Sequence, residues 1–208
     1  MPRPSARPVR AFLFDMGNVL LDFDFEPAFR RLAHSNGTTP RQVRDYFVQS
    51  GLEVLFDGGQ VTGRAFHRDV CRALDLPLSF GRFEKIWNGI FTPDRRMANL
   101  ARRLGRRYRM ALLSNTNAMH ARHVERRYPE ILGVFDHRLY SFREKMRKPD
   151  ARLYRRAART LKTEPGGIFY IDDRADLTEA AGELGFRTFT YRKNFSALER
   201  ELKKVGAL

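Results

Sequence analysis

The feature that most constrains the fold is a series of short apolar runs that each stop abruptly at polar residues. Such stops occur at Asp15, at Ser114-Asn115, in the loop 147–150 and at Asp172-Asp173. From about residue 93, apolar runs alternate with segments whose apolar residues recur every three or four positions. Alternation of strands and helices predicts right-handed crossovers and a parallel sheet. The polar ends would then meet at one edge of that sheet.

A long helical stretch interrupts this alternation after the first strand. Residues 23–92 show helical spacing, with turn residues between the segments and no convincing strand. We therefore predict an α/β fold in which a doubly wound parallel sheet takes residues 1–22 and 93–208. A small all-helical cap, residues 23–92, is inserted after the first strand. Because ligands of such sheets bind outside the carboxyl ends of the strands, the cap is expected to cover the binding pocket.

The same spacing gives approximate bounds for the elements. Predicted strands are 11–21 (running into a loop), 108–113, 138–141, 167–171 and 187–191. Predicted helices are 27–35, 40–49, 62–74, 79–88, 94–104, 118–127, 150–161, 177–184 and 197–204. The sequence contains no internal repeat.

Length and composition limit the class of protein. The chain has 208 residues, 42% of them hydrophobic, which suffices for one substantial domain with an insertion. Its single cysteine, Cys71, excludes an intramolecular disulfide and a cysteine-rich metal site. The basic segment 1–10 is not followed by the unbroken apolar core of a signal peptide, and no run approaches a membrane span. We therefore expect a cytoplasmic protein with no membrane partner.

The formal net charge of +15 is unusual for a chain of this size. The basic residues are scattered as pairs, such as Arg102-Arg103 and Arg126-Arg127, on segments with helical spacing. This arrangement favours a generally basic, solvated surface. Nucleic-acid binding is the less favoured alternative, and it predicts an affinity that falls steeply as salt is added.

Together the polar strand ends carry the groups that metal-assisted phosphoryl transfer requires. Hard oxygen ligands for Mg²⁺ are available from Asp15, the carbonyl of Gly17, Asp172 and Asp173. Donors to the phosphate of a small phosphorylated substrate are available from Ser114, Asn115, Thr116 and Lys148. Asp15 is then the catalytic nucleophile that attacks phosphorus, with Lys148 neutralising charge, and water releases the aspartyl-phosphate.

Each motif alone has a simpler explanation. A strand-end aspartate is more often a turn former or helix cap, and Ser114 opens a run of good N-cap residues. The segment 148–150 suits a helix start with proline in the first turn. The order and spacing of all four motifs together favour the catalytic interpretation.

At these residues the chain resembles the haloacid dehalogenase (HAD) superfamily of hydrolases over nearly its whole length. The motifs similar to those of that family are, in order, Asp15 with Val19, Ser114, Lys148 and Asp172-Asp173. The stretches 14–19, 113–117 and 146–150 resemble a bacterial subgroup with a small helical cap that includes α-D-glucose-1-phosphate phosphatase. The resemblance implies a Rossmann-like core, Mg²⁺ dependence and a small phosphorylated metabolite, with a sugar phosphate as one candidate. It also implies that Asp173 binds the metal directly and Asp172 supports it.

Gly17 departs from the pattern of most phosphatases in the superfamily, which carry a second aspartate two residues after the nucleophile. That aspartate protonates the leaving oxygen and then activates water, so general acid–base help of about 10²- to 10⁴-fold is missing at Gly17. The bacterial subgroup also carries glycine there. Asp22, Asp24 or a metal-bound water are candidates for the role, although the two aspartates more simply form a solvated hinge into the cap.

Two other functions stand as alternatives. A dehalogenase of this superfamily would use the same aspartate on a carbon–halogen bond without Mg²⁺, and the acid pair argues against it. A catalytically weak binding protein on this scaffold would use the excess of arginine to bind a nucleic acid or an acidic partner.

The histidines and large aromatic residues suggest structural roles. His120 and His123 lie three residues apart with no third ligand nearby in sequence, and we expect them on an exposed or partly packed helix face. Trp87 and Phe91 are expected to pack the cap against the core, with a sugar-binding face as the alternative.

Overall fold

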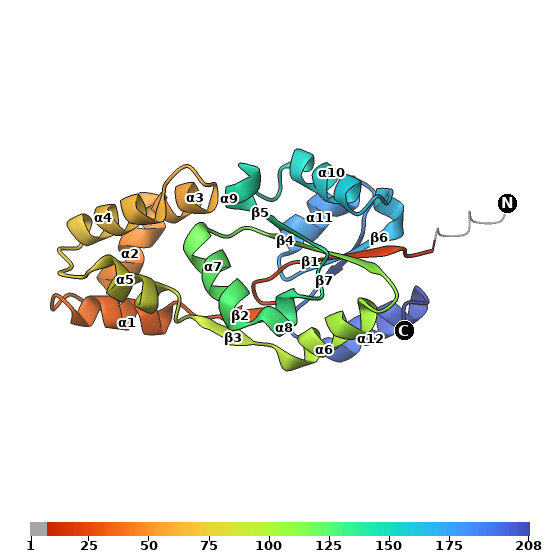
Figure 1. The fold of residues 1–208 in the computed structure, drawn as a ribbon, viewed down its shortest axis with the longest axis horizontal. Helices are drawn as coiled ribbons and strands as arrows, with labels where there is room; N and C mark the ends of the chain where they lie inside the picture. Colours follow the sequence, from red (N-terminus) through yellow and green to blue (C-terminus); the bar gives the residue numbers. More distant parts are fainter. Residues whose placement is uncertain (1–7) are drawn as a thin grey trace.

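The structure, a computed structural model, describes residues 8–208 and contains a five-stranded sheet in the order β5-β4-β1-β6-β7 (Figure 1). The strands are β1 (Ala11–Phe14), β4 (Arg109–Ser114), β5 (His137–Tyr140), β6 (Ile168–Asp172) and β7 (Arg187–Thr190). All four neighbouring pairs are parallel. The chain builds outward from β1 in both directions, so the predicted doubly wound α/β fold is confirmed.

β1 occupies the centre because all four of its side chains are apolar and none is exposed to solvent. Successive side chains of a strand point to opposite faces of the sheet. Phe12 and Phe14 therefore join the apolar cluster on one face, while Ala11 and Leu13 join the cluster on the other.

Helices cover both faces of the sheet (Figure 1). They are α6 (Arg95–Leu104), α7 (Ala118–Arg127), α8 (Pro129–Leu132), α9 (Ser141–Glu144), α10 (Ala151–Thr160), α11 (Ala175–Glu183) and α12 (Phe195–Lys204). A 3₁₀ turn, Pro165–Gly167, precedes β6. Buried residues of α6, α7, α8 and α12 pack with Phe12, and those of α10 and α11 pack with Leu13.

A helical insertion follows β1 and lies at one end of the molecule (Figure 1). Its helices are α1 (Glu26–His34), α2 (Pro40–Ser50), α3 (Leu52–Asp57), α4 (Gly63–Ala73) and α5 (Phe80–Trp87). Their inward faces share one apolar cluster that includes Phe47, Phe66, Phe83 and Trp87. Since a two-turn or three-turn helix is marginal alone, this shared cluster is what stabilises the insertion.

The helix ends in the insertion follow from local sequence. Thr39 and Gln42 form a capping box at the start of α2, which also has Pro40 in its first turn, and Gly51 ends the helix in the left-handed region. The side chains of Thr62 and Ser79 accept hydrogen bonds from the first turns of α4 and α5.

The structure corrects the sequence prediction in two respects. β2 (Leu21–Phe23) and β3 (Phe91–Pro93) form a two-stranded antiparallel ribbon at the base of the insertion, so the prediction of no strand in residues 23–92 is wrong there. The helices α3, α8 and α9 were also not predicted. All of these elements are too short to show a hydrophobic period, which explains why spacing alone missed them.

The insertion contacts the core through a close backbone approach at Gly59. A side chain at this position would place its Cβ atom 2.3 Å from the carbonyl oxygen of Phe142, and the positive φ of 68° also favours glycine. The Lys145 ammonium donates a short hydrogen bond to the Gly59 carbonyl. Met119 of α7 packs in the apolar cluster of the insertion. These contacts fix the insertion above the carboxyl ends of the strands.

No helix within residues 8–208 combines the length and the apolar character needed to cross a lipid bilayer.

The aromatic cluster of the insertion yields a stability prediction. The ring of Phe66 is fully buried. Its centroid lies 4.5 Å from the ring centroid of Phe56 and 5.1 Å from that of Trp87. We expect Phe66→Ala to lower the free energy of unfolding by about 3–5 kcal/mol, because the cavity cannot collapse. In urea unfolding, the control Val48→Ala, at a side chain 77% exposed, should change stability by less than about 0.5 kcal/mol. Equal effects of the two variants would contradict this account of the insertion.

Candidate active site

Four segments bring polar residues together at the carboxyl end of the sheet. Asp15 follows β1, Ser114 ends β4 and Asp172 ends β6. Because β1 is hydrogen-bonded to both β4 and β6, these three ends are adjacent. Lys148, in the loop between α9 and α10, completes the group by direct contact. The convergence inferred from the sequence is therefore present in the folded chain.

Lys148 lies at the centre of this group. Its Nζ donates hydrogen bonds to Oδ1 of Asp15 at 2.8 Å and to Oδ2 of Asp172 at 2.6 Å, and the residue is only 5% exposed. Burial alone would lower the pKa of Lys148, but the charges of the two carboxylates outweigh burial and raise that pKa. The ammonium group therefore stays protonated and offsets part of the negative charge of the site.

Asp15 is buried, and its ionisation is correspondingly costly. Burial raises the pKa of the Asp15 carboxyl to about 7, the charge of Lys148 acts in the opposite direction, and the charge of Asp172 adds to the rise. A further cation beside Asp15 would favour the ionised form that a nucleophile needs.

The two acids of the Asp172-Asp173 pair have different surroundings. Besides Lys148, the hydroxyl of Tyr170 donates a short hydrogen bond to Asp172, and the backbone N–H of Arg174 donates to Oδ1 of Asp172 at 3.0 Å. Asp173 is only half-buried, and among residues 8–208 its one side-chain donor is Nδ2 of Asn18, at 3.1 Å. Asn18 itself has a positive φ of 53° in the turn after β1. Asp173 therefore keeps more free lone pairs than Asp172.

The acids are close enough to share one metal ion. One carboxylate oxygen from each of Asp15, Asp172 and Asp173 lies within 4.8 Å of the others. A set of hard oxygen donors around partly offset negative charge suits Mg²⁺ better than a soft or imidazole-seeking metal. Gly17 also lines the cavity beside this cluster, so its carbonyl oxygen remains a candidate ligand.

The predicted phosphate-binding segment is only partly free to bind a ligand. Ser114 and Asn115 line the cavity. The Asn115 side chain, however, binds the backbone of Lys148 on both sides, donating to its carbonyl at 3.0 Å and accepting from its N–H at 2.8 Å. The backbone N–H of Thr116 donates to Oγ of Ser141 at 2.9 Å. This amide is therefore not available to bind phosphate, contrary to the sequence prediction. Asn115 thus positions the Lys148 loop.

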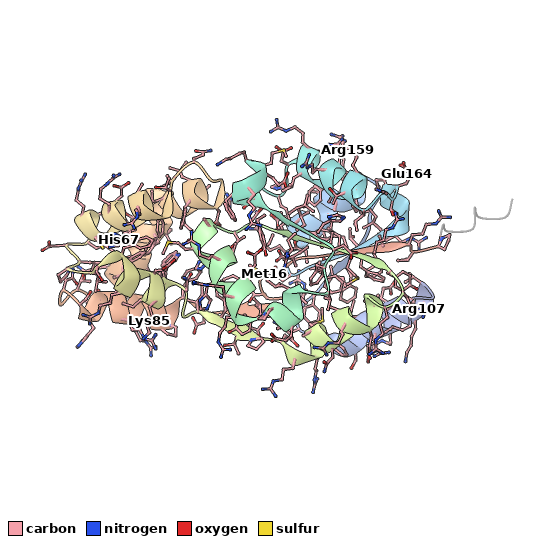
Figure 2. All side chains as sticks on the ribbon, viewed as in Figure 1. Met16, His67, Lys85, Arg107, Arg159 and Glu164 are labelled. Carbon is pink, nitrogen blue, oxygen red and sulfur yellow. The ribbon has the colours of Figure 1, made fainter. Side chains whose placement is uncertain are left out.

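A cavity of about 200 Å³ opens beside Asp15, between the sheet and the insertion. Figure 2 labels Met16, one of its lining residues, in the middle of the molecule. The other lining residues come from both parts of the chain: Asp15, Gly17, Phe23, Phe25, Glu53, Asp57, Ile90, Phe91, Ser114, Asn115, Thr116, His120, Arg147, Lys148, Asp173, Arg174 and Leu177. The insertion therefore covers the site, as the sequence analysis expected.

An aromatic ring occupies the space next to Gly17. A Cβ atom built on Gly17 would lie 2.8 Å from Cε1 of Phe23. Neither of the aspartates considered as substitutes is among the described residues that line the cavity. Asp22 instead pairs with Lys193, and Oδ1 of Asp24 accepts the backbone N–H of Glu26 at 2.9 Å. Both contacts fit the simpler interpretation of a solvated hinge.

The insertion contributes two acids that sequence analysis did not single out. Glu53 and Asp57 of α3 line the cavity, and Arg147 lies opposite, with 4.0 Å between its guanidinium and Oδ2 of Asp57. Nδ2 of Asn117 donates to Oδ1 of Asp57 at 3.0 Å, and Oγ of Ser141 donates to the Asp57 carbonyl at 2.6 Å. Burial raises the pKa of Glu53 to about 7 and that of Asp57 to about 6. Their helix is too short for spacing to have revealed them.

His120 was also misplaced by the sequence analysis. It is 5% exposed and lines the cavity, so the prediction of an exposed or partly packed helix face is wrong for this residue. Burial, with a smaller contribution from His123, lowers the pKa of His120 to about 3. The imidazole is therefore neutral at physiological pH.

Comparison with known proteins identifies the family. Residues 9–185 match the haloacid dehalogenase-like hydrolase family, and the chain therefore belongs to it. A curated relative, bifunctional epoxide hydrolase 2 from Sus scrofa, is 38% identical over 76 residues. That match covers 36% of this chain and only 14% of the relative.

Solved structures share the fold at low sequence identity. A HAD family enzyme from Bacteroides thetaiotaomicron, in complex with magnesium and inorganic phosphate, has a TM-score of 0.83 at 23% identity, with 91% of this chain and 98% of that chain covered. L-2-haloacid dehalogenase from Xanthobacter autotrophicus, with chloropropionic acid covalently bound, has a TM-score of 0.64 at 16% identity, with 94% and 83% covered. At these identities the likeness establishes the fold alone.

The buried position of Lys148 yields a prediction for the metal-free protein. We expect Lys148→Met to lower the free energy of unfolding at about pH 8 by roughly 3–5 kcal/mol, because two buried carboxylates lose their cation. The loss should be smaller at about pH 5.5. A raised pKa means that folded Asp15 binds more protons than unfolded Asp15 between about pH 4 and pH 7, so its ionisation costs stability as pH rises through that range.

The measurement is urea unfolding in chelator at both pH values. Lys193→Met, which breaks the exposed contact with Asp22, is the matched control and should cost less than about 1 kcal/mol. A loss for Lys148→Met that is small, or the same at both pH values, would contradict the assigned role of Lys148.

Proposed function

We propose that this member of the haloacid dehalogenase-like hydrolase family is a Mg²⁺-dependent phosphomonoesterase for a small phosphorylated metabolite, with sugar phosphates as candidates. One observation carries the proposal: Asp15 lines the cavity, contacts Lys148 at 2.8 Å and clusters with two further acids. The Bacteroides thetaiotaomicron enzyme of similar fold, which holds magnesium and phosphate, supports it.

The cation site is proposed to consist of Asp15, the Gly17 carbonyl, Asp172 and Asp173. Asp173 is assigned as the direct ligand because it keeps free lone pairs, and Asp172 as its support because protein donors occupy its oxygens. When bound there, Mg²⁺ would shield the carboxylates from the phosphate and polarise the phosphoryl group. Lys148 adds a fixed positive charge 2.8 Å from Oδ1 of Asp15.

The phosphate group is proposed to lie between Asp15 and the end of β4. Ser114 offers its hydroxyl as a donor to the phosphate. The side chain of Asn115 binds the Lys148 backbone and so fixes the loop that positions the Lys148 ammonium. These contacts orient the phosphorus atom toward Asp15 before reaction.

The chemical step forms and breaks one bond to phosphorus. An oxygen of Asp15 attacks phosphorus as the bond to the leaving oxygen breaks, which gives an aspartyl-phosphate and an alcohol once the leaving oxygen takes a proton. Water then attacks the aspartyl-phosphate, releases phosphate and regenerates the carboxylate. Since Gly17 has no side chain and the ring of Phe23 fills the adjacent space, the proton does not come from that position.

The division of the chain is also a proposal. We assign residues 1–22 and 93–208 to the catalytic core and residues 23–92 to a cap that selects the substrate. The presence of Glu53 and Asp57 in the cavity wall supports this assignment. The small helical insertion and the glycine at position 17 are consistent with the bacterial subgroup that includes α-D-glucose-1-phosphate phosphatase.

Removal of the nucleophile should abolish turnover while the fold remains intact. We expect Asp15→Asn to lower kcat by at least about 10³-fold on p-nitrophenyl phosphate or a metabolite phosphate. Its unfolding transition should be unchanged or higher, because the amide removes a buried charge. Asp22→Asn, outside the cavity, is the control and should keep its activity. Normal turnover by Asp15→Asn would refute the mechanism.

Metal removal should separate phosphatase from dehalogenase chemistry. We expect a chelator to abolish hydrolysis of phosphomonoesters and added Mg²⁺ to restore it, with no release of halide from 2-haloacids. The Mg²⁺ concentration for half-maximal activity should rise as pH falls below about 7, because protons compete for Asp15, whose pKa burial raises to about 7. Asp173→Asn should raise that concentration at every pH. Hydrolysis that persists in chelator would contradict the proposed metal site.

A further inference from the structure

The cavity that Asp15 lines contains polar groups that the proposed reaction does not use. They come from α7 of the core and α3 of the insertion, and the ribbon at the base of the insertion adds aromatic residues to the lining. If the phosphate binds at Asp15, the leaving group of a phosphomonoester occupies the rest of this cavity. The inference that follows therefore rests on the proposed phosphatase function.

His120 is held in place but keeps one polar atom without a partner. Its Nδ1 lies 3.0 Å from Oδ1 of Asn88, which requires Nδ1 to carry the proton. Its ring stacks on Trp87 at a centroid distance of 5.5 Å and an interplanar angle of 12°. Nε2 has no hydrogen-bond partner among residues 8–208, although the residue is 5% exposed. Nε2 is therefore a fixed acceptor next to the cavity.

An acceptor buried in this way is costly unless something binds it. An unsatisfied buried polar atom costs a folded protein free energy, and native structures contain few of them. Because burial lowers the pKa of His120 to about 3, Nε2 cannot satisfy itself by taking up a proton near neutral pH. A hydroxyl group or a water molecule that enters the cavity is a candidate for the missing partner.

Glu53 is a second acceptor that lines the cavity. It makes no hydrogen bond and no ion pair with any residue in the described part of the chain, whereas its neighbour Asp57 is bound by Asn117. The guanidinium of Arg147 lies 4.0 Å from Oδ2 of Asp57, and its charge offsets part of the rise that burial causes in the pKa of Glu53. Glu53 thus remains without a direct partner among the described residues and is available to an occupant.

The cavity that contains these two acceptors also has an aromatic lining. Phe23, Phe25 and Phe91 line the cavity, and the ring of Phe91 meets that of His120 edge to face at 5.0 Å. An occupant that suits this wall has apolar C–H surface for the rings and hydroxyl donors for the two acceptors. A polyhydroxylated ring or chain has both.

We propose that Glu53 and His120 are specificity-determining residues that accept hydrogen bonds from hydroxyl groups of the substrate's leaving group. The substrate class is then a phosphomonoester of a polyol or sugar, and esters with an apolar leaving group of similar size are poor substrates. His120 acts through Nε2, and Asn88 fixes the imidazole in the tautomer that makes Nε2 an acceptor.

The wild-type enzyme provides the first test. We expect kcat/KM for the best member of a panel of pentose and hexose phosphates to exceed that for cyclohexyl phosphate by about 100-fold, about tenfold for each hydrogen bond. Hydrolysis of p-nitrophenyl phosphate that requires Mg²⁺ and Asp15 shows separately that the phosphatase function holds. Such hydrolysis with no preference for hydroxylated esters would overturn this inference alone, and no hydrolysis of any ester would overturn both.

Two substitutions at His120 separate its two nitrogen atoms. The amide of His120→Asn can still reach Asn88 but offers nothing at Nε2, whereas the longer amide of His120→Gln restores an acceptor there. We expect His120→Asn to lower the ratio of kcat/KM for the sugar phosphate to that for cyclohexyl phosphate by about tenfold, and His120→Gln to recover most of it. His123→Asn, on the same helix and not among the described residues lining the cavity, is the matched control.

Glu53→Leu provides an independent measurement if the His120 variants fold poorly. It keeps a similar volume and removes the acceptor. It should lower the ratio of kcat/KM for the sugar phosphate to that for cyclohexyl phosphate by about tenfold or more. Calorimetric binding of the two esters to Asp15→Asn in Mg²⁺ should show the same preference without turnover. Ratios that match the wild type in both Glu53→Leu and His120→Asn would show that a bound water satisfies these acceptors, and would overturn the proposal.

Discussion

The buried contact of Lys148 with Asp15 and Asp172 is the interaction on which the rest of the site depends. Three carboxylates meet at the ends of β1 and β6, and their mutual repulsion would disfavour a common ionised state. One ammonium at 2.8 Å and 2.6 Å from two of them offsets part of this repulsion. The loop that carries Lys148 is fixed by two hydrogen bonds between the Asn115 side chain and the Lys148 backbone, so the residue that follows β4 determines where the charge lies.

The helical insertion lines the site and is fixed to the core by direct contacts, unlike a loosely attached lid. Asp57 receives hydrogen bonds from Asn117 and Ser141 of the core, and Asn88 binds His120 from the insertion side. Met119 packs among the aromatic residues of the insertion. Polar and apolar contacts thus cross the boundary together, and the two acceptors assigned to the leaving group line one cavity.

The sequence was sufficient to predict the parts of the fold that have a strong hydrophobic period. The buried strands that end at Asp15 and Asp172 and the amphipathic helices around them were located to within a few residues, because burial of an apolar face imposes that period. The convergence of Asp15, Lys148 and the acid pair followed from parallel strand order. The short elements β2, β3 and α3 were missed, because three to six residues are too few to show a period.

The same limit explains which site residues escaped prediction. Glu53 lies on α3, and His120 is buried because Trp87, distant in sequence, stacks on it. Neither position has a local signal, since each depends on how the insertion folds back on the core. The backbone amide of Thr116 was predicted to be free for phosphate, but it donates to Ser141, which comes from another strand end.

The charge of the whole chain and the charge of the site have opposite signs, and both suit the proposed reaction. A formal net charge of +15 attracts small anions over long distances and raises the rate at which phosphorylated metabolites encounter the protein. At the site, Asp15, Asp172 and Asp173 create a local negative field that Lys148 offsets only in part, and solvent screens the surface charge from it. In the proposed mechanism, a phosphate ester is therefore drawn to the surface by the first field and binds productively only once a divalent cation offsets the second.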